Sequence, residues 1–205
     1  MVLLWCLPPP HNQSVNLTLH TPPFFVHYAS LHSCTKAAPY ASQATLALSG
    51  STHMDITSFV ENNYKLFGSF DKPVLATDIH HCEECRDHND EVGGTDRRRL
   101  TPEQIGTACW GISSFLTPQA MGYYIPRFME LAVTAENDKD GVPYMCLYIN
   151  QIGLHSDSEQ FSLFSIEQRL AVHNSLVILK DLHLQTLTEH CWEDEIDTAI
   201  NQWST

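Results

Sequence analysis

The sequence predicts a mainly α-helical protein, folded as a single compact domain of four to six helices with at most one or two short strands. Two observations carry this prediction. Apolar residues recur at intervals of three and four along most of residues 54–205, which is the period of an amphipathic helix. Helix-start signals, in which Thr or Ser precedes Pro or is followed three positions later by Gln, stand before several of these apolar runs.

The first predicted helix covers residues 55–67, where apolar side chains recur at helical spacing and Gly68 follows as a stop. Residues 78–99 are polar and include two adjacent glycines, so a long loop is expected there. A loop of this length in a compact domain suggests a function or a bound ion. The run 101–104, with sequence TPEQ, then predicts another helix start.

The second half of the chain contains four further predicted elements, one of which is the helix that begins at Ser165. Thr117 and Pro118 begin a helix, which should break or kink at Pro126 because proline lacks the N–H that continues the hydrogen-bond ladder. Residues 142–149 are apolar and fit a strand or a buried extended segment. A closing amphipathic helix carries its acids in its first half, and its apolar residues are Trp192, Ile196, Ala199, Ile200 and Trp203.

The strongest helix signal is the capping box that begins at Ser165, with Gln three positions later. The residues that follow place Ile166, Leu170, His173 and Val177 on one face, widened by Leu176 and Leu179, and this face is expected to enter the core. A histidine on such a face is predicted to be a core residue with its hydrogen bonds satisfied rather than a ligand.

Charge is distributed very unevenly along the chain. The protein has 24 acidic and 11 basic side chains, giving a formal net charge of −13, which argues against nucleic-acid or anionic-membrane binding. No apolar run approaches the roughly 18 residues that a membrane span needs.

Residues 1–53 hold a single charged side chain, Lys36, and six of the eleven prolines. We interpret them as a disordered leader that derives from upstream translation, with the natural start at Met54; a genuine disordered tail and an export signal are the alternatives.

Metal-ligand residue types are densest between His80 and His88. A Cys-x-x-Cys turn formed by Cys82 and Cys85 can place two thiolates on one ion, and His81 or His88 can add a third ligand. These residues are therefore candidate ligands for zinc. The sequence has no second Cys pair, so the motif supplies half of a structural zinc site.

Two other interpretations of the thiols remain open. Cys82 and Cys85 can form a redox pair, although the adjacent acids Glu83, Glu84 and Asp87 disfavour thiolate formation. The thiols can also pack as small hydrophobic side chains under a loop.

Aromatic and basic clusters give weaker candidates. Trp110, Tyr123 and Tyr124 are candidate binding residues that can line a pocket, although aromatics at helical spacing more often belong to the core. Residues 97–99, three arginines, can bind an anion or pair with nearby acids. The chain contains none of the glycine-rich nucleotide loops, the G-x-S-x-G motif or the H-E-x-x-H motif.

These motifs together resemble a bacterial family of small proteins that is catalogued as a domain of unknown function. Residues 81–85 are similar to its H-C-x-E-C motif, Trp110 to its tryptophan, and residues 115–126 to its F-L-T-P-E-A-x-x-Y-Y-L-P core, with Gln119 and Ile125 as departures. The resemblance extends over about residues 56–203. The resemblance implies that the chain belongs to that family, and it assigns no catalytic residue.

The function predicted from these observations is that of an acidic, soluble, cytoplasmic interaction protein of the immunity or antitoxin type. Opposite charge would speed its encounter with a basic protein partner. The alternative is a zinc-binding domain or metal-dependent enzyme that uses Cys82 and Cys85, and a thiol oxidoreductase is a remote third. An enzymatic role is the less favoured of these.

Overall fold

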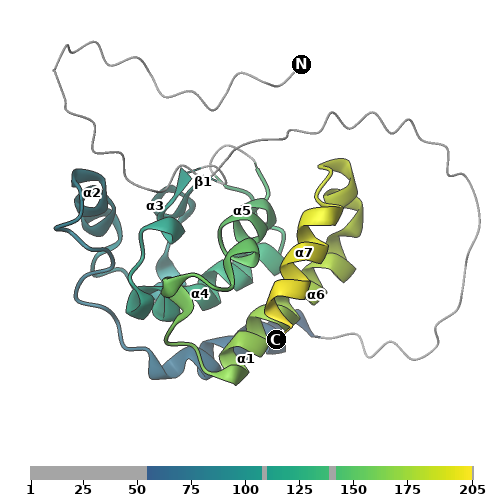
Figure 1. The fold of residues 1–205 in the computed structure, drawn as a ribbon, viewed down its shortest axis with the longest axis horizontal. Helices are drawn as coiled ribbons and strands as arrows, with labels where there is room; N and C mark the ends of the chain where they lie inside the picture. Colours follow the sequence, from purple (N-terminus) through teal and green to yellow (C-terminus); the bar gives the residue numbers. More distant parts are fainter. Residues whose placement is uncertain (1–54, 108–109, 139–141, 205) are drawn as a thin grey trace, which may run out of the picture. The chain divides into compact units, whose positions relative to one another are not determined.

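The structure is a computed structural model, and it describes residues 55–107, 110–138 and 142–204. Within these ranges the mainly α-helical prediction is confirmed, because the elements are seven α-helices and two very short strands (Figure 1). The predicted leader and the predicted start at Met54 lie outside the described residues. The elements are α1 (Ile56–Leu66), α2 (Glu83–Val92), α3 (Pro102–Ile105), β1 (Gly106–Thr107), β2 (Trp110–Gly111), α4 (Pro118–Val133), α5 (Tyr144–Gln151), α6 (Ile166–Glu189) and α7 (Glu193–Trp203).

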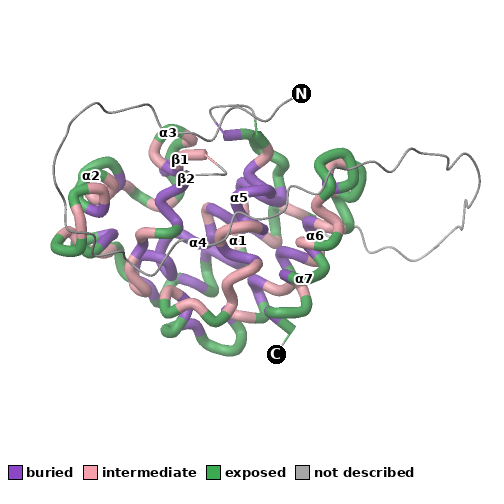
Figure 2. The backbone as a smooth tube through the Cα atoms, turned by 45° about the horizontal axis from the view of Figure 1, so that its top comes forward, coloured by how far each residue is buried: buried purple, intermediate pink, exposed green. Residues whose placement is uncertain are grey.

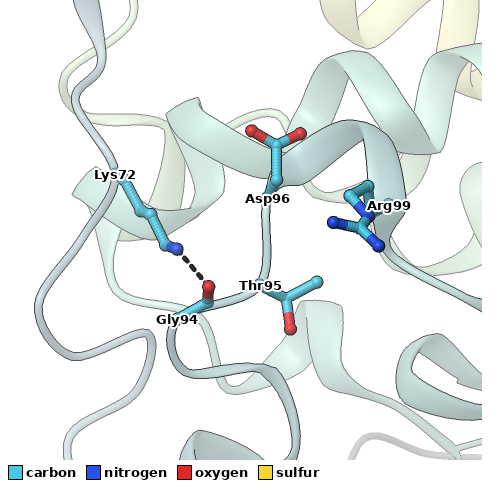
Figure 3. A pocket seen from close by; sticks show the side chains of 5 residues that line it. All are labelled: Lys72, Gly94, Thr95, Asp96 and Arg99. Atoms are coloured by element: carbon cyan, nitrogen blue, oxygen red, sulfur yellow. Dashed lines mark hydrogen bonds between the residues drawn. The ribbon is translucent and has the colours of Figure 1, made fainter.

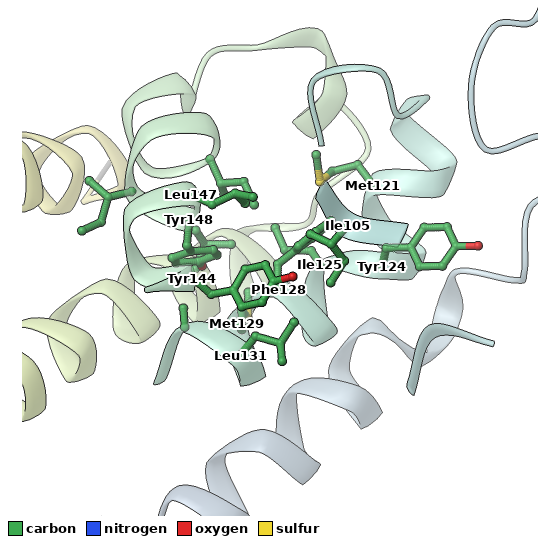
Figure 4. Close-up of a cluster of buried hydrophobic side chains, with 14 of the residues drawn as sticks. Ile105, Met121, Tyr124, Ile125, Phe128, Met129, Leu131, Tyr144, Leu147 and Tyr148 are labelled. Atoms are coloured by element: carbon green, nitrogen blue, oxygen red, sulfur yellow. The ribbon is translucent and has the colours of Figure 1, made fainter. Parts of the chain in front are cut away.

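Helix α4 is the centre of the core. Twelve of its sixteen residues are buried, and its side chains interlock with those of α5 (Figure 4). The hydroxyl of Thr117 caps the helix by accepting the N–H of Ala120 at 3.3 Å. The helix continues unbroken through Pro126, so the predicted break is absent. Burial on nearly every side of the helix outweighs the roughly 3 kcal/mol that an interior proline costs.

Helices α6 and α7 pack against each other beside α4 and α5. Both halves of the predicted capping box are present at Ser165. At the C-terminal end of α7, the indole N–H of Trp203 donates to the carbonyl of Gly153 at 3.1 Å. The Trp203 ring packs edge to face against Phe161, with ring centroids 5.0 Å apart. The closing helix predicted from the sequence is therefore confirmed as α7, and its last tryptophan joins it to the core.

Two segments differ from their predicted structure. Residues 78–99 are not a long loop, since they contain α2 and a short 3-10 helix at Arg97–Arg99. Only Cys85 and Val92 of α2 are buried, so the helix has no apolar period to detect. The segment 142–149 is not extended, because α5 occupies most of it; six of the eight residues of α5 are buried, and a helix enclosed on all sides also lacks a period.

The predicted core face of α6 is correct at Leu176 and Leu179, which are buried, and wrong at Ile166 and Leu170. Ile166 is 83% exposed and Leu170 is 53% exposed, while Figure 2 shows that buried residues concentrate on α4 and α5. His173 is half-buried and is not a core residue. Its Nδ1 lies 3.4 Å from Asn174 Oδ1. The face of α6 that enters the core carries Gln168, Ala171, Val172, Ser175, Leu176, Ile178 and Leu179.

This outcome has a physical reason: α6 has apolar residues on two opposite faces. The small side chains of Ala171 and Ser175 allow one face to approach its neighbours closely, and Val172, Leu176 and Leu179 fill that contact. The periodicity of the sequence does not say which of the two faces turns inward.

No helix of the described ranges is both long and apolar enough to cross a membrane.

Candidate metal centre

The N-terminal end of α2 brings three of the predicted ligands together. Cys82 is the N-cap residue in an extended conformation, and its Sγ accepts the backbone N–H of Cys85 at 3.2 Å. Glu83 and Glu84 occupy the first turn, where negative charge is favourable to the helix dipole. The local sequence therefore begins the helix on the first thiol and places the second thiol one turn further along.

The three ligand atoms lie close to one another. The Sγ atoms of Cys82 and Cys85 are 3.0 Å apart, and Nδ1 of His81 is 3.5 Å from the Sγ of Cys85. All three atoms lie within 4.8 Å of one another. Tetrahedral zinc with ordinary bond lengths places S and N ligands about 3.5 Å apart and two S ligands about 3.8 Å apart. The edge from His81 to Cys85 already has this spacing, and the edge between the two sulfurs needs to widen by about 0.8 Å.

The two thiols differ in burial and in pKa. Cys82 is partly exposed, and the hydrogen bonds it receives from the side chain and backbone of Cys85 lower its pKa. Cys85 is buried, and burial together with the Cys82 sulfur and the charges of Glu84 and Asp78 raises its pKa to about 11. Cys82 is therefore the thiol that ionises first, contrary to the expectation that neighbouring acids would suppress the thiolate at both positions.

The segment before α2 fixes this site to the core. The hydroxyl of Thr77 donates a hydrogen bond to the carbonyl of Cys85, and the N–H of Ala76 donates to Asn89 Oδ1 at 2.9 Å. The carbonyl of Ala76 accepts the N–H of Thr117, the cap of α4, at 2.9 Å. Hydrogen bonds thus connect the backbone that carries the thiol pair to the start of α4, the central helix.

His88, the fourth predicted ligand, lies apart from the group of three. Its ring packs on Phe115 with centroids 4.6 Å apart, and its Nδ1 is 3.7 Å from Glu91 Oε2. Neither ring nitrogen has a hydrogen-bond partner within the described residues. The spacing of the sequence allowed His88 to reach the thiols, but the contact with Phe115 directs it elsewhere.

The predicted aromatic binding residues lie in the buried central helix and in the short strand β2. Tyr123 and Tyr124 are buried in α4, with rings 4.9 Å apart. The hydroxyl of Tyr124 donates to the carbonyls of Val92 and Thr95, and that of Tyr123 accepts the N–H of Arg97. The tyrosines therefore hold the segment that follows α2, while Trp110 belongs to β2.

The three consecutive arginines have separate roles. The guanidinium of Arg97 donates to the carbonyls of Phe67 and Tyr64 at 3.0 and 3.2 Å. Arg98 forms a two-bond pair with Glu61, with both distances 2.8 Å, and this pair lowers the pKa of the Glu61 carboxyl. Arg99 is exposed. The predicted pairing with an acid is thus confirmed for Arg98, and anion binding stays a prediction.

A surface pocket lies just beyond the C-terminal end of α2. It has a volume of about 490 Å³ and is lined by Lys72, Gly94, Thr95, Asp96 and Arg99 (Figure 3). The Lys72 ammonium is directed to the carbonyl of Gly94. The sequence pointed to Arg99 as one of three arginines that can bind an anion, but not to Lys72, which is more than twenty residues from the other lining residues.

Among the described residues, the other cysteines and His155 are not part of the thiol group. Cys146 is buried in α5, Cys191 is disulfide-bonded, and Cys109 lies outside the described residues. His155 belongs to a short 3-10 helix after α5. In the part of the chain that the structure describes, the group of His81, Cys82 and Cys85 is therefore the candidate site.

The fold and the site define a helical protein with a preformed His-Cys-x-x-Cys group at a helix N-terminus. Comparison with protein-family models, with curated proteins and with solved structures gives no match. The resemblance drawn from the sequence motifs stays a prediction.

Proposed function

We propose that His81, Cys82 and Cys85 bind a soft divalent metal ion, with zinc as the best fit to the ligand set. The observation that carries the proposal is the convergence of one imidazole and two thiol ligand atoms within 4.8 Å. Zinc combines thiolate and imidazole ligands at tetrahedral spacing, and harder ions such as magnesium prefer oxygen.

The electrostatics of the site suit a divalent cation. Two thiolates neutralise the charge of the ion, and the nearby carboxylates of Asp78 and Glu84 add negative potential. His81 is exposed and Cys82 is partly exposed, so the fourth position opens to solvent. Three protein ligands with an open fourth position are typical of zinc sites at which water or an external ligand binds.

Titration of the reduced full-length chain with cobalt(II) tests this proposal. Cobalt replaces zinc in such sites and gives a thiolate charge-transfer absorption, so the readout reports sulfur ligation directly. We expect about one equivalent of thiolate-bound cobalt, displaced by zinc. Cys82→Ser, Cys85→Ser and His81→Ala should each weaken binding at least about tenfold, since each removes a ligand.

Two neighbouring histidines provide matched controls. His80→Ala removes an exposed imidazole next to the site, and His88→Ala removes the imidazole that packs on Phe115. Both variants should bind cobalt like the original chain. Equal affinity in the three ligand variants, or less than about a tenth of an equivalent bound, would contradict the proposal.

A second candidate function is thiol–disulfide exchange at the same pair, and the sulfur separation of 3.0 Å favours it. The Cys82 thiolate would attack one sulfur of a small disulfide and release one thiolate. The Cys85 thiol would then lose its proton to solvent, attack Cys82 Sγ and release the second thiolate. One disulfide is reduced to two thiols while the pair is oxidised to a disulfide.

Oxidised glutathione distinguishes the two functions. Exchange predicts a loss of two hydrogens from the metal-free reduced chain, and a trapped glutathione adduct in Cys85→Ser. Metal binding alone predicts neither product on Cys82.

The predicted interaction with a basic protein partner rests on the net charge of −13.

A further inference from the structure

We propose that the surface pocket beyond the C-terminal end of α2 binds the phosphate group of a small phosphorylated molecule. Two of the five lining residues, Lys72 and Arg99, are cationic, and a third, Thr95, carries a hydroxyl (Figure 3). These three side chains offer N–H and O–H donors to an anion. The inference is independent of the metal centre, because the ten residues of α2 separate the two places by about 15 Å.

Neither cation of the pocket is paired with an acid. None of the ion pairs formed within the described residues includes Lys72 or Arg99. The chain has 24 acidic and only 11 basic side chains, so acids are plentiful enough to pair every base. Arg98, next to Arg99, is paired in this way with Glu61. Two unpaired cations at one pocket of so acidic a chain therefore point to an external anion.

The three side chains keep donor groups for a ligand. The Lys72 ammonium gives one of its three protons to the carbonyl of Gly94, which leaves two. The Thr95 hydroxyl accepts the side-chain amide of Gln104 at 3.1 Å, and its own proton is left to donate. The guanidinium of Arg99 is a planar fork of donors, which matches two oxygens of one phosphate.

Hydrogen bonds hold the pocket in place without a ligand. Gly94 has a φ of +81°, a left-handed conformation that turns the chain after α2 and presents the glycine carbonyl to Lys72. From α4, the hydroxyl of Tyr124 donates to the carbonyl of Thr95 at 3.3 Å. The side-chain amide of Gln119, also in α4, donates to the carbonyl that precedes Lys72 at 3.1 Å. The central helix thus fixes both walls, and a pre-formed site loses little entropy on binding.

Size and charge narrow the class of ligand. The volume of about 490 Å³ is ordinary for a metabolite site and far larger than a free phosphate ion, so the phosphate is expected to belong to a larger molecule. Asp96 adds a carboxylate, whose Oδ1 accepts the backbone N–H of Arg98 at 2.9 Å. Figure 3 shows this carboxylate directed away from Gly94 and Thr95. Its charge repels a phosphate held by the two cations and therefore limits the affinity.

Isothermal titration calorimetry of the metal-free full-length chain at pH 8 tests the proposal with glycerol 3-phosphate, inorganic phosphate and glycerol. Both phosphates are dianions at this pH. We expect one molecule of glycerol 3-phosphate to bind with a dissociation constant of about a millimolar or below, inorganic phosphate to bind more weakly and glycerol not to bind. Removal of metal ensures that no phosphate binds to an ion at the thiols.

Charge-removing variants locate the bound phosphate. Lys72→Gln and Arg99→Gln should each weaken binding at least about fivefold, because each removes charge-assisted hydrogen bonds. Lys65→Gln is the matched control: it changes the net charge equally, but Lys65 is exposed on α1 and does not line the pocket. Asp96→Asn should tighten binding, because the amide oxygen can still accept the Arg98 N–H while the repelling charge is gone.

Five outcomes would overturn the proposal. They are no saturable binding of glycerol 3-phosphate up to about 10 mM, tighter binding of inorganic phosphate than of glycerol 3-phosphate, and an affinity that Lys72→Gln or Arg99→Gln leaves unchanged. The other two are an equal loss in Lys65→Gln, which would show an effect of net charge alone, and weaker binding by Asp96→Asn. All four substituted side chains are exposed, so unchanged midpoints of thermal unfolding are expected and show that each variant is folded.

Discussion

Gly122 of α4 lies directly against the ring of Phe70. A Cβ at position 122 would overlap the ring carbons Cδ1 and Cε1. Phe70 also packs against Phe67 and Phe164, with ring centroids 6.2 and 5.9 Å away. The glycine therefore lets a cluster of three phenylalanine rings, from two distant parts of the chain, rest on the central helix.

Gly122→Ala is expected to destabilise the protein by about 1–3 kcal/mol, because the added methyl group must displace a packed ring. Gly68→Ala is the control, since a Cβ there would meet no atom within 4 Å. Urea denaturation of both variants measures the difference. Equal midpoints for Gly122→Ala and the original chain would show that the ring has room to move.

Arg97→Lys is expected to cost about 1–2 kcal/mol, because lysine cannot reproduce the two guanidinium hydrogen bonds to Phe67 and Tyr64. The guanidinium also lies 5.5 Å and 5.1 Å from the ring centroids of Tyr64 and Tyr123. Arg99→Lys, at the exposed neighbouring position, should change stability by less than about 0.5 kcal/mol. Thermal unfolding compares the two, and similar losses in both would argue against a special role for Arg97.

Ser175→Ala should destabilise the core more than Tyr148→Phe. The Ser175 hydroxyl donates to the carbonyl of Val172, so the buried Tyr148 hydroxyl, 2.6 Å away, must donate to Ser175. Tyr148→Phe leaves Ser175 its bond to Val172 and should cost about 1 kcal/mol. Ser175→Ala leaves the Tyr148 hydroxyl unpaired, which costs about 1–3 kcal/mol. Denaturant titration gives the order, and the reverse order would show that Tyr148 has another acceptor.

Cys82 should react with iodoacetamide at least tenfold faster than Cys85 at pH 7.5 in the metal-free chain. The pKa of Cys82 is lowered, so its reactive thiolate fraction is larger than that of an ordinary thiol. Cys85, with its pKa raised to about 11, is almost wholly protonated there. As pH rises, the Cys82 rate should level off first and the Cys85 rate should still increase at pH 10. Mass spectrometry of the labelled peptides measures both rates, and equal, slow labelling would contradict the assigned difference.

The candidate site was largely predictable because it is local. Cys82, Cys85 and His81 lie within five residues, and any turn or helix start at Cys82 brings them close together. The difference in pKa between the two thiols was not predictable, because it depends on which one is buried. The exclusion of His88 was likewise decided by Phe115, which is far away in the sequence.

The sequence by itself determined the mainly α-helical class, the caps at Thr117 and Ser165 and the thiol pair, since these follow from local backbone preferences and short spacings. Only the tertiary structure decided that residues 83–92 and 144–151 are helices and that Ile166 and Leu170 face outward. Those outcomes depend on which surfaces meet. A helix that is almost wholly polar, one that is wholly buried and one with two apolar faces each lack a period that selects a single face.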